Sequence, residues 1–121
     1  MERNRRVIFY KHYFRDFFNV QNEKVQEKID FVLFMISVTD RIPQKFFTHI
    51  EGTDGLYEIR IEYQSNIFRI FCCFDEGKLV VLFNGFQKKS QKTPPNEIER
   101  ALNIRKEYFY EKNKGRKKEK R

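Results

Sequence analysis

Alternation of apolar and polar residues predicts several β-strands in this chain. Tyr57–Tyr63 alternates cleanly, with the even-numbered positions polar, which is typical of a strand with one buried face. Residues 68–74 continue the alternation after a short turn, and residues 75–78 contain the glycine expected of a hairpin. Residues 79–83 are almost continuously apolar, as in a strand covered on both faces. A shorter run of β-branched and aromatic residues, 7–10, predicts a further strand near the N-terminus.

Helical spacing marks two segments between the first strand and the others. Within residues 11–18, three phenylalanines recur at positions that share one face of a short helix. A longer helix is predicted to begin after Asn22, a favourable N-cap, and to end before residues 40–43. Its second half adds Phe31 and Phe34 to an already broad apolar stripe, so burial on most sides is expected there.

A last helix follows the strands. Thr93 is expected to be its N-cap and Pro94 its first residue, where the missing N–H of proline costs nothing. Residues 112–121 consist of Lys, Arg, Glu, Asn and Gly, and we expect this tail to be disordered. With no internal repeat and no linker, residues 1–111 are predicted to form one domain. Its predicted fold is α+β, with a small, mostly antiparallel sheet of about four strands, N-terminal helices packed on it and a C-terminal helix.

The net charge of +8 and the pI of about 9.6 favour nucleic acid, an anionic membrane surface or an acidic protein as partner. Much of this charge lies in the tail, which carries seven Lys or Arg and one Glu, and the remaining chain is only about +2. The placement of the charges must therefore decide between these partners.

The cysteines and histidines suggest neither a disulfide nor a metal site. Cys72 and Cys73 are neighbours on a predicted strand and would point to opposite faces, so we expect reduced thiols and a cytoplasmic protein. His12 and His49 stand alone, without the spacing of a zinc site, and no cofactor is expected. A histidine in a connector, such as His49, is typical of a surface or local hydrogen-bonding residue. The apolar run at residues 7–10 is too short for a signal peptide, and no segment reaches transmembrane length.

Basic side chains gather on one face of the predicted sheet. If each hairpin closes through a four-residue turn, Arg69 lies opposite both Glu62 and Asn84, with Arg60 as a diagonal neighbour. Lys88 keeps the same parity if the last strand extends far enough. A guanidinium group can donate two parallel hydrogen bonds to the oxygens of one phosphate, so this face suits a phosphate-rich ligand.

The segment after the last strand suits single-stranded RNA, since bases can stack on aromatic rings while lysines hold phosphates. It interleaves Lys88, Lys89 and Lys92 with Phe86, Gln87 and Gln91. A solvated turn explains this segment as well, and pairing with Glu58 and Glu62 would account for Arg60 and Arg69 without any ligand. From the residues alone, both interpretations stay open.

Three stretches together resemble a known family: EGTDGLYEIR at residues 51–60, FRIF at 68–71 and GFQKKSQKTP at 85–94, followed by Glu97, Glu99, Ala101 and Arg105. In order and element sequence, roughly residues 7–110 resemble the phage-derived Gp49-like or HigB-like toxins of the RelE/ParE superfamily. The resemblance implies a toxin of a type II toxin–antitoxin module. Such proteins are mostly endoribonucleases that cut translated mRNA on the ribosome, without metal, through attack of a ribose 2′-OH on the adjacent phosphate. The implied partners are the ribosome, mRNA and a cognate antitoxin, usually a helix-turn-helix, HigA-like protein.

By motif position, the resemblance implies that Arg60 and Arg69 hold and neutralise the phosphate, while Lys88 and Lys89 lie where an acid or base is usually found. The expected catalytic residues are therefore Arg60, Arg69, Lys88 and Lys89. The expected RNA-binding residues are Phe86, Gln87, Gln91 and Lys92.

The sequence departs from the family pattern in two ways. Many relatives end in a catalytic Tyr or His, and neither Tyr108, Tyr110 nor His49 matches it. Glu58 stands where some mRNA-cutting relatives carry a lysine, so the proton-transfer groups stay open. Two alternatives follow: a ParE-like toxin that binds gyrase without RNA chemistry, and a non-catalytic nucleic-acid-binding module.

Overall fold

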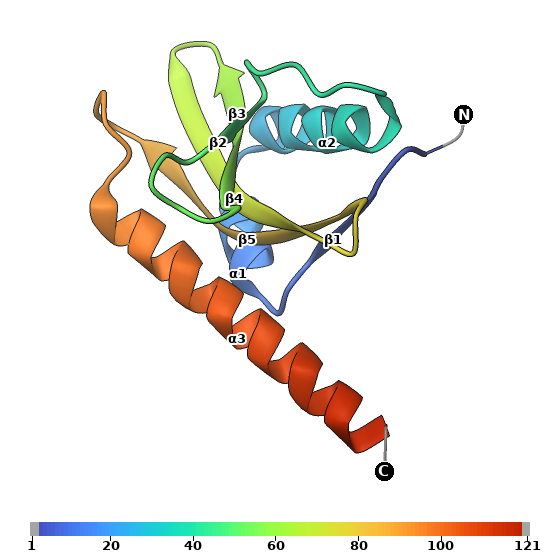
Figure 1. The fold of residues 1–121 in the computed structure, drawn as a ribbon. Coiled ribbons are helices and arrows are strands. Elements are labelled where there is room, and N and C mark those ends of the chain that lie inside the picture. The colour runs from blue at the N-terminus through green and yellow to red at the C-terminus, as the bar shows by residue number, and fades with distance from the viewer. Residues whose placement is uncertain (1–2, 120–121) are drawn as a thin grey trace.

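The computed structural model of the protein describes residues 3–119 and contains three helices and five strands (Figure 1). In chain order the elements are β1 (Arg6–Phe9), α1 (Tyr13–Asn19), α2 (Glu23–Val38), β2 (Phe47–His49), β3 (Tyr57–Tyr63), β4 (Asn66–Asp75), β5 (Leu79–Lys88) and α3 (Pro95–Glu119).

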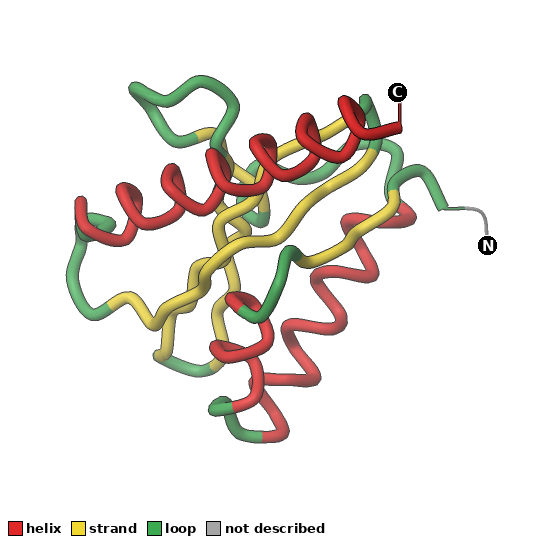
Figure 2. Tube along the Cα trace, turned by 90° about the horizontal axis from the view of Figure 1, so that it is seen from below, coloured by secondary structure: helices red, strands yellow, loops and turns green. Residues whose placement is uncertain are grey.

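The strands form one mixed sheet in the order β1-β5-β4-β3-β2. β1 runs parallel to β5, and the other pairs are antiparallel. α3 crosses one face of the sheet, and α1 and α2 lie on the other (Figures 1 and 2). The predicted α+β class is confirmed, with one strand more than expected. The additional strand is β2, whose three residues are too few to show any periodicity and are defined only by pairing with β3.

The alternation along the strands builds two separate cores. Ile29, Val32 and Ile36 of α2 are buried against one face of the sheet, while Ala101 and Ile104 of α3 are buried against the other. Each fully buried aliphatic side chain contributes about 1.5–3 kcal/mol through the hydrophobic effect. The two cores together hold the sheet as the middle layer of the protein.

The two cysteines follow the same alternation. Cys72 belongs to the core under α2 and Cys73 to the core under α3, and both are free thiols. Burial raises the pKa of both thiols, in Cys73 to about 11, so neither is a reactive thiolate. The expectation of unpaired cysteines on opposite faces is confirmed.

α2 begins as predicted but is less buried than predicted. The side chain of Asn22 caps the helix, since its Oδ1 accepts a hydrogen bond from the backbone N–H of Val25 at 2.9 Å. Phe31 and Phe34 are 57% and 46% exposed, so the prediction of burial on most sides of the second half is wrong. α2 packs on the sheet with one stripe only, and no other described element covers its outer side.

The hairpin registers differ from the assumed ones, yet the predicted faces are retained. Tyr63 pairs with Asn66 across a two-residue turn, so Arg60 lies directly opposite Arg69. This register is two residues away from the assumed one, and a shift of two preserves the face of every side chain. Between β4 and β5, the turn is shorter than assumed and shifts the pairing by one residue. A β-bulge after Ile70 shifts it by one more, so the total shift at Arg69 is again two residues.

α3 starts one residue later than predicted. The carbonyl of Pro94 accepts hydrogen bonds from the backbone N–H groups of Glu97 and Ile98, at 3.0 and 3.4 Å. Pro94 therefore occupies the capping position, and Pro95 is the first helical residue. Because both prolines fit the start of a helix, the sequence did not fix which of them begins it.

The helix also extends to Glu119, through most of the segment predicted to be disordered. Lys and Glu are good helix formers, and Lys112 anchors the helix to the β4–β5 turn with its Nζ 2.7 Å from Asp75 Oδ2. Tyr108 donates a second hydrogen bond to the same oxygen at 2.6 Å. Residues 120–121 of the predicted tail lie outside the described residues.

Substitution of Gly85 by alanine is expected to destabilise the protein by about 1–3 kcal/mol, the usual cost of overpacking a core. A Cβ at Gly85 would lie 2.5 Å from Cδ2 of Phe17, a side chain held between α1 and β5. Urea denaturation would measure the loss. Gly115 has open space around its Cα, and because it is a helical glycine, Gly115→Ala should instead raise stability by about 0.5–1 kcal/mol. Equal effects of both substitutions would contradict the close packing of α1 on β5.

Candidate phosphate-binding cleft

Two arginines lie side by side in neighbouring strands, on the face of the sheet that α3 covers. Arg60 of β3 pairs directly with Arg69 of β4. Arg69 is buried, with 4% of its surface exposed, whereas the Arg60 side chain is 40% exposed. Like charges directly opposite each other in a sheet are destabilising. The pair therefore requires a compensating negative charge from a neighbouring residue or from a ligand.

Glu58 supplies part of this compensation. It lies on the same face of β3, with its side chain 10% exposed, and its two carboxylate oxygens are 3.7 Å from Arg69 Nε and 3.9 Å from Arg60 Nε. These distances allow charge attraction but are too long for hydrogen bonds. The expected ion pair with Glu58 is thus present, while Glu62 has no carboxylate oxygen within 4 Å of either arginine.

The guanidinium of Arg69 keeps unused hydrogen-bond donors. Its Nη1 donates to the carbonyl of Phe68 at 3.0 Å. Its Nε is buried without a hydrogen-bond partner among the described residues, as is Oε2 of Glu58. An unsatisfied buried donor of this kind costs free energy that a bound oxyanion could recover. Burial lowers the pKa of Arg69, Glu58 raises it and Arg60 lowers it again, but an arginine stays charged in proteins.

Lys88 completes the basic face. It is the last residue of β5, pairs with Ile67 and shares the face of Arg69. Partial burial lowers the pKa of Lys88, and the positive charges of Arg69 and Arg60 lower it further against the opposing effect of Glu58. A lysine with a lowered pKa releases its proton more readily than an ordinary lysine, which favours a role in proton transfer.

The basic residues line two adjoining hollows. The first, of about 540 Å³, is lined by Arg60, Ile67, Arg69, Lys88, Lys89, Ser90 and Gln91. The second, of about 580 Å³, shares the first three of these and adds Lys28, Lys45, Phe46, Ile61 and Glu62. We call the two hollows together the basic cleft, with the arginine pair at its middle.

The structure brings Arg60, Arg69, Lys88, Lys89 and Gln91 together, as the sequence predicted, but not the other expected RNA-binding residues. Gln87 pairs with Phe68 and so faces α1, where its Nε2 donates to Asn66 Oδ1 at 3.2 Å. Phe86 shares the face of Arg69 but is half-buried, stacked on Phe71 at a centroid distance of 5.6 Å. Lys92 lines neither hollow.

Sequence reasoning missed Lys28 and Lys45. Lys28 belongs to α2, and Lys45 precedes β2 in a segment interpreted as a connector. Neither position carries a local signal, because the packing of α2 on β3 brings Lys28 beside the arginine pair and the pairing of β2 with β3 brings Lys45 there.

The tyrosines and the histidine considered as proton-transfer groups lie outside the basic cleft. The hydroxyl of Tyr108 donates a hydrogen bond to Asp75, and Tyr110 is 68% exposed on α3. The Nε2 atom of His49 is 2.9 Å from the carbonyl oxygen of Thr53, which confirms its expected local role.

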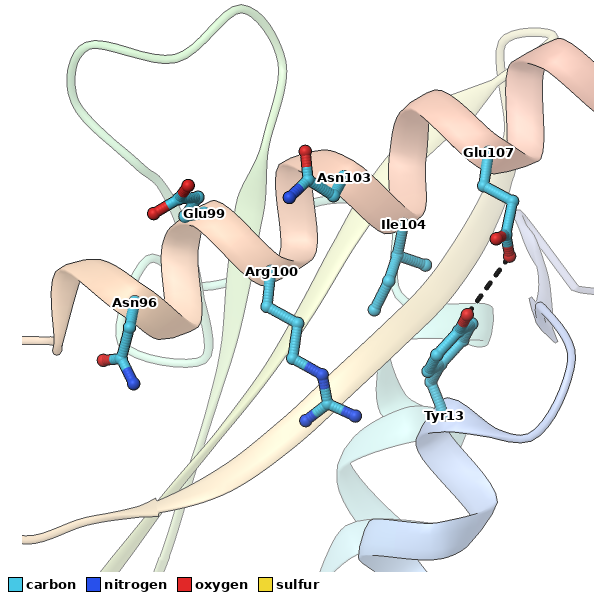
Figure 3. A pocket seen from close by; sticks show the side chains of 7 residues that line it. All are labelled: Tyr13, Asn96, Glu99, Arg100, Asn103, Ile104 and Glu107. Carbon is cyan, nitrogen blue, oxygen red and sulfur yellow. Dashed lines mark hydrogen bonds between the residues drawn. The ribbon is translucent and has the colours of Figure 1, made fainter.

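A further hollow of about 400 Å³ separates α1 from α3 (Figure 3). Tyr13 donates a hydrogen bond to Glu107 at 3.1 Å on its wall, while Arg100 and Glu99 add charges of both signs. It shares no lining residue with the basic cleft. Its mixed charge suits a polyanion less well than the basic cleft does.

Within the described residues there is no cluster of three or more His, Cys, Asp or Glu side chains arranged to hold a metal ion. A search of the same residues for a helix long and apolar enough to cross a membrane also found none.

The fold and the cleft define a small α+β protein with a basic cleft on the face of its sheet that carries Arg60 and Arg69. The chain belongs to the family of phage-derived Gp49-like proteins, whose family model matches residues 16–106. This match confirms the resemblance seen in the sequence. Among solved structures, the chain is similar to one in the crystal structure of the archaeal RelE–RelB complex from Pyrococcus horikoshii OT3. That chain is 16% identical, with a TM-score of 0.48, and the match covers 74% of the present chain and 98% of the other. Comparison with curated proteins found no match.

Proposed function

We propose that this protein is the toxin of a type II toxin–antitoxin module and acts as a ribosome-dependent endoribonuclease on translated mRNA. Membership of the Gp49-like family supports the toxin class. The observation that carries the proposed chemistry is the buried Arg69, directly opposite Arg60 and with an unused Nε donor, on the face that also carries Lys88. The proposed partners are a cognate, helix-turn-helix HigA-like antitoxin, the ribosome and mRNA, all in the cytoplasm.

In the proposed reaction, the ribose 2′-oxygen forms a bond to the adjacent phosphorus while the bond from phosphorus to the 5′-oxygen breaks. The products are a 2′,3′-cyclic phosphate and a 5′-hydroxyl. The 2′-OH must lose a proton, the 5′-oxygen must gain one, and negative charge grows on the phosphoryl oxygens in between. Donors placed around such growing charge are usually the largest catalytic contribution.

The basic cleft offers a group for each of these needs. Arg69 and Arg60 would bind the phosphoryl oxygens, since guanidinium forks match phosphate geometry. Lys88, whose pKa is lowered, would accept the 2′-OH proton in its neutral form. Lys89, on the exposed segment that follows, would donate a proton to the 5′-oxygen or hold a neighbouring phosphate.

Induced expression in a bacterial host, with primer extension on a reporter mRNA, tests the proposal. Wild type should stop growth and produce new mRNA ends within translated codons, but not in the same mRNA lacking its start codon. Arg60→Ala removes an exposed phosphate ligand without disturbing a core, and cleavage should slow by about 100-fold. Arg15→Ala, an exposed arginine of α1 outside the basic cleft, should behave as wild type.

Two outcomes would overturn the proposal. Growth arrest without new mRNA ends would indicate a toxin that binds a protein target such as gyrase. Binding of RNA with no cleavage and no arrest would indicate a non-catalytic nucleic-acid-binding module.

A further inference from the structure

The second hollow of the basic cleft lies over an open part of the sheet edge. β2 pairs with β3 only as far as Ile59, and the backbone N–H of Arg60 then donates to the carbonyl of Phe46 at 2.9 Å. Beyond that bond, β3 continues to Tyr63, and no strand among residues 3–119 pairs with it on this side. The hollow extends from the arginine pair over this edge to Lys28 on α2.

The lysines of this hollow are not neutralised by the protein. Lys28 is half-buried with its Nζ 5.7 Å from the ring centroid of Phe31, and Lys45 is exposed with its Nζ 4.9 Å from that of Phe46. Neither Nζ has a carboxylate oxygen within 4 Å in the described part of the chain. Together with the arginine pair, four cations line this hollow among the described residues, and Glu62 is the one carboxylate that lines it with them. Glu58, outside the lining, compensates part of the charge of the arginines but of neither lysine.

Phe46 gives this hollow an apolar surface beside its cations. Its ring is half-buried, so its position is fixed by packing against the core under α2 while part of it still borders the hollow. A fixed aromatic ring next to lysines is the combination that binds single-stranded nucleic acid, because the base stacks while the ammonium groups hold the backbone.

The arginine pair connects this hollow to the one that contains Lys88. Arg60, Ile67 and Arg69 line both. A single strand with one phosphate on the arginine pair therefore has a basic path in two directions, toward Lys88 and Lys89 on one side and toward Lys28 and Lys45 on the other.

We propose that Lys28, Lys45 and Phe46 form a subsite for the RNA nucleotide next to the cleaved phosphate. The lysines bind the phosphate of that nucleotide, and Phe46 packs against its base. This inference rests on the proposed function and adds to it the path of the substrate strand. The subsite binds RNA without reading its sequence, since neither lysine nor phenylalanine distinguishes one base from another through hydrogen bonds.

Single-turnover cleavage of mRNA on programmed ribosomes, at increasing protein concentration, tests the subsite. Lys28→Ala/Lys45→Ala should raise the concentration needed for half-maximal rate by about tenfold, since two phosphate contacts are lost. The maximal rate should stay within about twofold, because these side chains do not touch the reacting atoms. Lys78→Ala/Lys106→Ala removes the same charge from exposed positions outside the cleft and should change neither parameter.

An mRNA with an abasic residue on either side of the cleavage point separates contact with the substrate from contact with the ribosome. Wild type should lose about fivefold or more in apparent affinity for one of the two abasic substrates, the loss of one stacked base. Phe46→Leu should lose as much on normal mRNA and nothing further on that abasic substrate. Equal abasic penalties in both proteins, or a double lysine variant that matches the Lys78→Ala/Lys106→Ala control, would overturn the subsite. In either case, cleavage by wild type would leave the proposed function standing, whereas a wild type that cuts no mRNA would overturn both.

Discussion

Arg69→Ala is expected to reduce the rate of mRNA cleavage by at least about 100-fold, the usual effect of removing one preorganised donor from a developing oxyanion. The loss should exceed that of Arg60→Ala. Arg69 is buried and held by its bond to the Phe68 carbonyl, so little reorganisation is needed when charge develops on the phosphate. The Arg60 side chain is 40% exposed to solvent and must become ordered when it binds the phosphate. Single-turnover cleavage on programmed ribosomes gives both rates.

A folding defect must be separated from a catalytic one, because Arg69→Ala removes one of the two arginines that compensate the buried Glu58 carboxylate and leaves Arg60, whose Nε is 3.9 Å away. Removal of one partner from a buried ion pair costs about 3–5 kcal/mol, and less is expected here because the pair is 3.7 Å apart. The variant Arg69→Lys keeps the positive charge for Glu58 but loses the planar fork. Its thermal unfolding should lie nearer to wild type than that of Arg69→Ala, with cleavage still strongly impaired. Cleavage by a folded Arg69→Ala protein within about threefold of wild type would contradict the role of Arg69 in charge stabilisation.

The sequence predicted the faces of the sheet better than its register. The assumed turns placed Glu62 opposite Arg69, whereas Arg60 takes that position. Arg60, Arg69 and Lys88 nevertheless share a face, because at Arg69 each of the two hairpins is shifted by two residues from the assumed register. Face is determined by a period of two along each strand, and register by turn lengths and a bulge that no local pattern reveals.

Residues that join the cleft through packing between layers were beyond sequence reasoning. Lys28 reaches the arginine pair because of how α2 lies on β3, and Lys45 because three residues pair as β2. Gln87 shows the opposite error: it belongs to the expected basic segment, but the parity of β5 turns it to the face of α1. A run of sequence that reads as one motif is divided between two faces when it continues a strand.

The exposure of two phenylalanines on α2 was also mispredicted because it depends on packing between layers. The stripe of α2 predicted burial of Phe31 and Phe34, since apolar residues at helical spacing usually face a core. Only a neighbour on the outer side of α2 could have buried them, and the sheet lies on the inner side. The periodicity was therefore sufficient to place the helix but not to define how wide its buried stripe is.

Lys88 should make the cleavage rate depend on pH. Substitution of Lys88 should remove this dependence, whereas substitution of other residues in the cleft should not. Its pKa lies below the ordinary value for lysine, and a base must be neutral to accept the 2′-OH proton. The neutral fraction rises with pH up to that pKa. The single-turnover rate should therefore increase by close to tenfold per pH unit from pH 6.5 upward and level off near the pKa of Lys88, because each unit below the pKa lowers the neutral fraction about tenfold.

Two substitutions distinguish proton transfer from charge. Lys88→Gln removes both and should slow cleavage by about 10²–10⁴-fold, the usual contribution of a positioned acid or base. Lys88→Arg keeps the positive charge but does not deprotonate, so mRNA affinity should be retained while the rate falls and the rising limb of the pH profile disappears. Arg60→Ala serves as the control, since it lowers the rate by a different route and should keep the slope of the profile. If Lys88→Arg cleaves at the wild-type rate with the wild-type pH profile, Lys88 acts only as a cation, and the proton must be taken by another group in the cleft.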